Sequence, residues 1–179
     1  YSQCLVSGKG NGTFGPEEPV TYGEMATSLL RMLGYTSAQV GAVWPLDYTA
    51  YCDELGLSEG LSLDAYDNLN RGQAAVLLYR AMKAPVSGST QAYYETIEGV
   101  VSTEEAILLD GNASYGGSSG LLMAYVPADG GITYYTQGDT KSEALAGYLG
   151  HLLFDSSGRV LGFLPEDGGC QDLTIGSAS

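Results

Sequence analysis

The feature that most constrains the fold of this chain is a helix design that occurs twice. Residues 21–34 read TYGEMATSLLRMLG, and residues 70–82 read NRGQAAVLLYRAM. Both segments open with the spacing of a capping box, in which two side chains three positions apart satisfy backbone N–H groups of the opening turn. The pairs are Thr21 with Glu24 and Asn70 with Gln73. The sequence therefore predicts two amphipathic helices of the same design.

Apolar residues at helical intervals predict which side of each helix is buried. The expected buried positions are Met25, Leu29 and Leu33 in the first helix and Ala74, Leu78 and Met82 in the last. Gly34 and Pro85 are the expected stops, since neither residue type continues a helix well. A further helix is predicted between them, after Trp44-Pro45, because proline suits the first helical position. Its expected buried face contains Tyr48, Cys52 and Leu55, and Gly56 is its expected end.

The two similar helices belong to a larger repeated unit. When residues 21–33 are aligned with residues 70–82, Arg31 falls on Arg80, and upstream LVSG (5–8) matches LSEG (57–60). A helix–loop–helix unit is thus predicted about one and a half times, with the first copy missing its first helix. Such units bury their apolar faces mainly against neighbouring units. Because Tyr1 opens directly into mid-domain sequence, a mature form or a fragment is expected.

After Pro85 the sequence changes to short strand-like runs. These runs are YYETIEGVV, EEAILLD, GLLMAYV, GITYYTQ, YLGHLLFD and RVLGFLP. PADGG and DSSGR are turn signals, and TKSEALAG predicts one or two helical turns. If they lie on strands, the pairs Tyr93-Tyr94 and Tyr134-Tyr135 each place one ring inward and one outward. Five or six strands of this length predict a small antiparallel barrel or sandwich.

The predicted class is therefore α+β. We expect helical repeats in residues 1–84, a linker in 85–92, a small β-rich domain in 93–166 and a Gly/Ser-rich tail in 167–179. The strand-rich part loosely resembles small OB-like barrels.

Composition excludes several classes of partner. The chain has 21 Asp and Glu against 7 Lys and Arg, a net charge of −14. Nucleic-acid binding requires Lys and Arg to displace counterions from phosphates, so no nucleic acid is expected. No apolar run reaches transmembrane length and no signal-peptide pattern is present, so no membrane insertion is expected. The abundance of tyrosine and glycine, 14 and 26 residues, is typical of extracellular surfaces.

No catalytic, metal or cofactor site is predicted. His151 lies inside a strand-like run with no nucleophile motif around it, and one histidine gives too few ligands for a Cys/His zinc site. DGNASYGG, from Asp110, begins like a calcium loop, but Tyr115 and Leu121 stand where glycine and glutamate are required. The cysteines have no Cys-x-x-Cys spacing and allow one disulfide in any of three pairings. They are Cys4, Cys52 and Cys170.

The helical half resembles the S-layer homology family. The residues that carry this resemblance are GKGNGTFGPEEPVTYGEMATSLLRMLG (8–34) and residues 44–82. The family pattern is a helix containing tryptophan, a Gly-rich turn leading to Phe-x-Pro, and a helix start similar to Thr-Arg-Ala-Glu. GTFGP matches the turn, and the segments that begin at Thr21 and Asn70 match the helix start. The resemblance covers roughly the first 83 residues.

This resemblance implies an extracellular protein on a bacterial cell surface, held noncovalently to secondary cell-wall polysaccharide. In the family, the helix-start arginine and the tryptophan region contact the glycan, which indicates Arg71 and Trp44 as the glycan-binding residues here. A guanidinium can bind an anionic sugar carboxylate through two hydrogen bonds, and an indole can stack on a sugar ring. The sequence departs from the family where Tyr22 takes the arginine position of the first copy and where an aspartate is missing ahead of Trp44.

Three functions follow from these observations. The favoured one is a non-enzymatic structural protein whose helical module packs with neighbouring copies into a surface layer, filament or wall-attached assembly. The alternative is an anchor module that binds cell-wall polysaccharide. A wall-associated hydrolase is the third. Tyr22, in place of arginine, favours packing over glycan binding.

Overall fold

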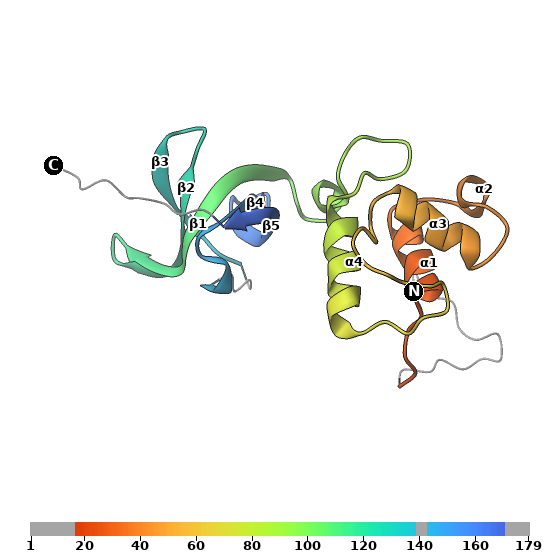
Figure 1. Ribbon diagram of the computed structural model, residues 1–179. Helices are drawn as coiled ribbons and strands as arrows, with labels where there is room; N and C mark the ends of the chain where they lie inside the picture. The colour runs from red at the N-terminus through yellow and green to blue at the C-terminus, as the bar shows by residue number, and fades with distance from the viewer. Residues whose placement is uncertain (1–16, 139–142, 171–179) are drawn as a thin grey trace. The chain divides into compact units, whose positions relative to one another are not determined.

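The computed structural model describes residues 17–138 and 143–170 (Figure 1). The chain divides between Thr96 and Ile97 into two compact units, which are described separately. The first unit consists of helices, and the second contains an antiparallel sheet. The predicted α+β class is therefore confirmed.

Among its described residues, the helical unit contains the three predicted α-helices, one short α-helix that was not predicted and one 3-10 helix. Its elements are α1 (Tyr22–Met32), α2 (Ser37–Val40), α3 (Leu46–Glu54), α4 (Arg71–Lys83) and the 3-10 helix η1 (Tyr93–Thr96). Both predicted capping boxes are present, at Thr21 and at Asn70. The unpredicted helix α2 has a capping box of its own, at Thr36 and Gln39. Local capping chemistry therefore defines where most of these helices begin.

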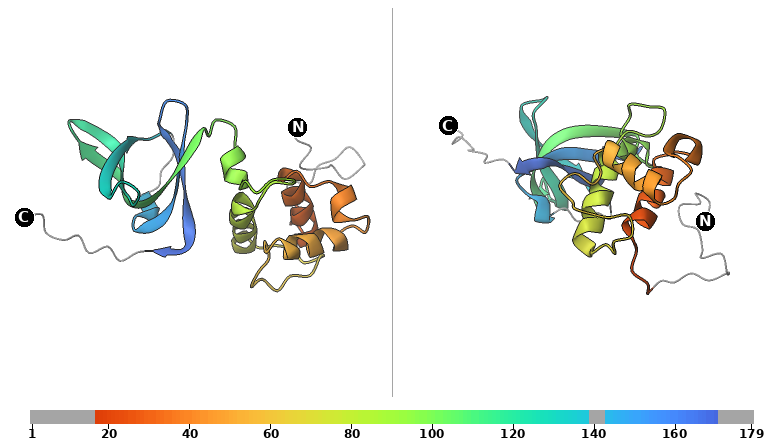
Figure 2. Two further views of the ribbon diagram at one scale, coloured as in Figure 1. Left: turned by 90° about the horizontal axis from the view of Figure 1, so that it is seen from above. Right: turned by 45° about the vertical axis from the view of Figure 1, so that its right-hand side comes forward.

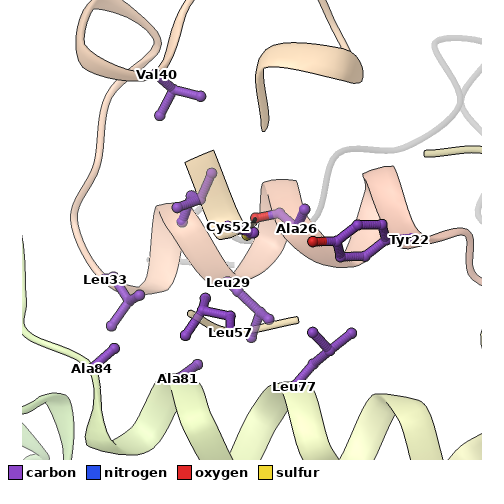
Figure 3. Close-up of a cluster of buried hydrophobic side chains, with 11 residues drawn as sticks. Tyr22, Ala26, Leu29, Leu33, Val40, Cys52, Leu57, Leu77, Ala81 and Ala84 are labelled. Carbon is purple, nitrogen blue, oxygen red and sulfur yellow. Dashed lines mark hydrogen bonds between the residues drawn. The ribbon is translucent and has the colours of Figure 1, made fainter. Parts of the chain in front are cut away.

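The core of the helical unit lies around α1, which packs against α3 and α4 (Figure 3). Two sides of α1 are buried, because Leu29 and Leu30 are both inaccessible to solvent. The partners that meet this helix include Cys52 of α3, Leu57 of the following loop, and Leu77 and Ala81 of α4. The core thus joins the two copies of the helix design into one unit.

The predicted buried face of α4 is wrong. Leu77 and Ala81 are fully buried, whereas Leu78 is 46% exposed. Its counterpart in α1, Leu29, is only 2% exposed. Helical periodicity predicts an apolar stripe but leaves its exact orientation to the neighbouring elements, and here α1 and Leu57 meet α4 on the side of Leu77 (Figure 3). The two copies share their caps but bury different faces.

Arg80, the arginine that recurs in both copies, has a structural role in the second. Its Nη1 donates hydrogen bonds to the backbone oxygens of Leu57, at 3.1 Å, and Glu59, at 2.6 Å. Both acceptors belong to the LSEG segment (57–60), which matches residues 5–8 of the first copy. Arg80 therefore ties the second helix of the copy to the loop after its first helix.

Residues 85–96 are hydrogen-bonded within the helical unit. The Ser87 N–H donates to the Leu33 oxygen at 2.8 Å, and Gln39 Nε2 donates to Ser87 Oγ at 2.8 Å. The predicted strand YYETIEGVV is wrong, because Tyr93–Thr96 form η1 and Tyr94 is buried. The Thr96 hydroxyl closes that turn by donating to the Tyr93 oxygen at 2.7 Å, so Tyr93 and Tyr94 do not alternate across a sheet.

The β unit is one five-stranded antiparallel sheet with the order β3-β2-β1-β4-β5. Its strands are β1 (Ser102–Tyr115), β2 (Ser118–Val126), β3 (Gly131–Thr136), β4 (Tyr148–Phe154) and β5 (Val160–Cys170). The 3-10 helix η2 (Glu143–Leu145) lies between β3 and β4, within the predicted TKSEALAG segment. The strands twist and curve strongly (Figure 2).

The five later strand predictions are confirmed, with two differences in extent. β1 continues through DGNASY, and the chain turns instead at Gly116-Gly117, where both residues have positive φ angles of 60° and 85°. β5 continues to Cys170, beyond the predicted run that ended at Pro165. A single parallel bridge joins Gln137 to Val160, but the sheet is not closed, so the barrel remains a prediction.

One face of the sheet forms the core of the β unit. Its buried members are Ala106, Leu108, Leu122, Ala124, Val126, Leu152, Phe154, Val160 and Phe163. Tyr135 packs against this cluster, while its neighbour Tyr134 stacks on Tyr115 instead. The predicted alternation of Tyr134 and Tyr135 across the sheet is therefore confirmed.

Candidate functional site

Trp44 lies in the segment that leads into α3, and its polar edge is fixed. The indole Nε1 donates to Thr27 Oγ1 at 3.0 Å, and that hydroxyl donates in turn to the Gly23 oxygen at 2.7 Å. The side chain is nevertheless 55% exposed. A ring held at one edge and open on its surface loses little conformational freedom when a ligand stacks on it.

Tyr66 is a second exposed aromatic residue beside the start of α1, and the sequence analysis missed it. It is 68% exposed and follows Ala65, whose oxygen accepts a hydrogen bond from the Gly23 N–H at 2.9 Å. A Cβ atom on Gly23 would lie 2.5 Å from Pro45 Cβ and 3.0 Å from the Ala65 oxygen. Gly23 therefore lets the segments that carry Trp44 and Tyr66 meet over the first turn of α1.

Arg71 is exposed at the first position of α4. Among the residues that the structure describes, its side chain has no hydrogen bond or ion pair. The loop before it is held to α1, because the Tyr22 N–H donates to the Asp67 oxygen at 2.8 Å. No contact joins Arg71 to Trp44 within the described part of the chain, so a shared glycan site for these two residues stays a prediction.

Tyr22, which occupies the arginine position in the first copy, is a core residue. Its ring is buried, and its hydroxyl donates to Asp53 Oδ1 at 2.8 Å. Burial raises the pKa of Tyr22 well above its usual value. The same carboxylate oxygen accepts a hydrogen bond from the Ser58 hydroxyl. Tyr22 therefore packs in the core, whereas Arg71, at the equivalent position of the second copy, is exposed to solvent.

The described residues contain no group of three or more His, Cys, Asp or Glu side chains able to hold a metal ion.

His151 lies in β4, with Nε2 3.0 Å from Glu166 Oε1. This pair places a carboxylate beside the ring. Within the described ranges, no helix is long and apolar enough to cross a membrane.

Cys52 is a free thiol in the core of the helical unit. Burial raises the pKa of its thiol to about 12, so the reactive thiolate is scarce at neutral pH. Cys4 and the side chain of Cys170 lie outside the described residues, so their pairing stays open.

The chain is similar to known cell-surface sequences. Residues 2–26 match the model of the S-layer homology domain, a match that ends in the second turn of α1. Over 142 residues the chain is 30% identical to a cell surface protein of Thermoanaerobacter kivui. That alignment covers 77% of this chain but 18% of the relative, so the chain spans about a fifth of the relative's length.

No solved structure is significantly similar to the chain. The family match rests on the turn and helix-start residues that carried the resemblance in the first copy, whereas the second copy lies outside the matched range. The chain therefore carries S-layer homology sequence and is related to a bacterial cell surface protein.

Proposed function

We propose that this chain is a non-enzymatic structural part of an extracellular cell-surface protein. Its helical unit docks against the helical unit of a neighbouring copy, within a surface layer, filament or wall-attached assembly. The S-layer homology match and the relative named as a cell surface protein support the location. The net charge of −14 favours a solvated surface that does not bind nucleic acid or anionic membranes.

The observation that carries this proposal is the difference between the two helix copies. The face of α1 that contains Ala26 and Leu29 is buried, whereas the equivalent face of α4, with Ala75 and Leu78, is exposed. Repeat units bury such faces against the next unit. The exposed face of α4 is therefore the surface on which a second helical unit docks.

We expect the purified chain to associate reversibly as its concentration rises, and Leu78→Glu to abolish the association. A charge placed at the centre of an apolar contact loses its hydration without gaining a partner. Sedimentation equilibrium measures this directly. Val43→Glu is the matched control, because Val43 is also exposed but lies away from α4, in the segment before α3. A strict monomer at high concentration, or equal effects of the two substitutions, would contradict the proposal.

The second candidate function is binding of cell-wall polysaccharide by the helical unit. The observation that favours it is the exposed pair Trp44 and Tyr66 beside the start of α1, together with the exposed Arg71, which has no partner among the described residues. Aromatic rings supply stacking surfaces for sugars, and a guanidinium supplies paired donors for a carboxylate. This combination suits an acidic wall glycan.

If this candidate is correct, Trp44→Ala and Arg71→Ala each reduce retention on purified wall polysaccharide, by about tenfold for loss of one such contact. Arg31→Ala is the matched control, since it removes the same charge from the last turn of α1. A pull-down with graded polymer concentrations provides the measurement. No retention of the unmodified chain would exclude this function.

A further inference from the structure

The sheet of the β unit has a second apolar face that its own core does not use. On β2, Leu122, Ala124 and Val126 point into the core, so Met123 and Tyr125 between them point to the opposite face. In the antiparallel register, Met123 pairs with Tyr134 of β3, and Tyr125 pairs with Ile132. Four large apolar or aromatic side chains are therefore adjacent on the outward side of β2 and β3.

Tyr115, at the end of β1, extends this group. Its ring is stacked on that of Tyr134, with centroids 4.3 Å apart and planes inclined by 8°. Tyr115 is 63% exposed, and Ile132 is 50% exposed. We name these five residues the tyrosine face: Tyr115, Met123, Tyr125, Ile132 and Tyr134. Met123, Tyr125 and Tyr134 are half-buried, and a contiguous apolar group that remains accessible to solvent marks a candidate site for a ligand or partner.

Gln137 holds the tyrosine face in its arrangement. Its Nε2 donates to the Gly111 oxygen, at 2.7 Å, and to the Gly120 oxygen, at 3.0 Å. Those two oxygens belong to β1 and β2 near the hairpin whose end carries Tyr115. The side chain of Gln137 therefore clamps the hairpin to the end of β3 and keeps Tyr115 against Tyr134. A preformed aromatic surface binds a ligand at a lower entropic cost than a flexible one.

The charge of the β unit decides which ligand fits this surface. Arg159 is the one Lys or Arg residue among the described residues of the unit. Its Nη2 forms an ion pair with Asp155 Oδ2 at 2.9 Å. On β1, Glu105 is exposed on the outward side, whereas the carboxylate of its neighbour Glu104 accepts a hydrogen bond from Tyr135 on the core side. An anionic polymer would be repelled by these carboxylates, and Arg159, the cation among the described residues of the unit, is already paired. A neutral ligand with apolar faces and hydroxyl groups meets no such barrier.

We propose that the tyrosine face binds a neutral oligosaccharide. The C–H faces of the sugars stack on the exposed ring of Tyr115 and on the half-buried rings of Tyr134 and Tyr125, and the tyrosine hydroxyls exchange hydrogen bonds with sugar hydroxyls. This site lies in the β unit and differs from the Trp44 and Tyr66 region, which suits an acidic glycan. The chain would then contact two kinds of surface polymer through two separate units.

Isothermal titration calorimetry with two neutral probes, chitohexaose and cellohexaose, tests this site. We expect at least one probe to bind, and Tyr115→Ala and Tyr134→Ala each to weaken its binding by about tenfold. Val101→Ala is the matched control, because Val101 is also 63% exposed in the β unit but lies outside the tyrosine face, so its substitution should leave the affinity unchanged. Circular dichroism of each variant establishes that the sheet remains folded.

Several results would overturn the proposal. One is the absence of binding by both probes, and another is equal weakening by Val101→Ala. Binding of polygalacturonate that is tighter than that of the neutral probes and that Tyr115→Ala and Tyr134→Ala weaken would point to an anionic ligand at this face instead. Self-association that Tyr134→Ala abolishes would identify a second copy of the chain as the occupant. Failure at Tyr115 and Tyr134 leaves the Leu78 and Trp44 tests unaffected, so the two proposals fail separately.

Discussion

Replacement of Leu29 by alanine will lower the free energy of unfolding of the helical unit by about 2–5 kcal/mol, the usual cost of truncating a fully buried leucine. Leu29 is 2% exposed in the core around α1. The equivalent substitution in the other copy, Leu78→Ala, will change it by less than about 0.5 kcal/mol in dilute protein, because Leu78 is largely exposed. The two variants differ only in which copy of the same helix position they alter.

Urea denaturation followed by tryptophan fluorescence measures this difference. Trp44 is the single tryptophan of the chain and lies in the helical unit, so its signal reports that unit alone. The midpoint should fall for Leu29→Ala, with little change in the slope of the transition. Equal losses for the two variants would mean that both copies bury the same face and would refute the description of α4.

Gly150→Ala will destabilise the β unit by more than about 3 kcal/mol, because overpacking usually costs 1–3 kcal/mol and here the obstacle includes backbone. Gly150 lies in β4, and a Cβ atom there would clash with the Leu164 oxygen and would lie 2.7 Å from Pro165 Cα. These atoms belong to β5, so the two strands would have to separate. A flexible side chain could move aside, but strand backbone cannot do so without losing its hydrogen bonds.

Gly162→Ala on β5 is the matched control. A Cβ atom there has Leu153 Cδ1 at 3.7 Å as its nearest neighbour, an ordinary contact distance. Far-UV circular dichroism during urea denaturation should show early loss of sheet for Gly150→Ala and near wild-type behaviour for Gly162→Ala. Unchanged tryptophan fluorescence in both variants would place the effect in the β unit. Equal stability of the two variants would contradict the close approach of β4 and β5 at Gly150.

Local chemistry in the sequence predicted most helix starts and most strands. The capping boxes at Thr21 and Asn70 depend on residues three positions apart, and the structure has both. Strand alternation likewise predicted that one of Tyr134 and Tyr135 points inward and the other outward, and in the structure Tyr135 is the one that packs against the core. These features depend on neighbours in the sequence, so a single sequence contains the information that determines them.

Features that depend on distant neighbours were missed. The buried side of α4 depends on where α1 and Leu57 lie, and periodicity placed Leu78 inside when it is exposed. YYETIEGVV has strand-like composition, but Tyr94 is drawn into a buried position and the segment forms η1. Long-range packing overrides local preference in such segments.

The candidate sites were predictable only in part. The resemblance indicated Trp44, and its exposure with a fixed indole is consistent with a binding surface. Tyr66 stood in an acidic turn with no motif, and only its position beside Gly23 and Pro45 makes it relevant. The stacking of Tyr115 on Tyr134 joins residues from β1 and β3, which the sequence alone gives no means of pairing.

The central claim is that the exposed face of α4 docks a second helical unit, and site-specific photo-crosslinking at position 78 tests it most directly. A benzophenone amino acid is placed at Leu78, with Ala50 on the exposed side of α3 as the control position. Illumination at high protein concentration should yield a covalent dimer from position 78 and little from position 50. The crosslinked peptides should map to the partner's helical unit, residues 17–96. No dimer from position 78, equal yields from the two positions, or crosslinks that map to the β unit would contradict the claim.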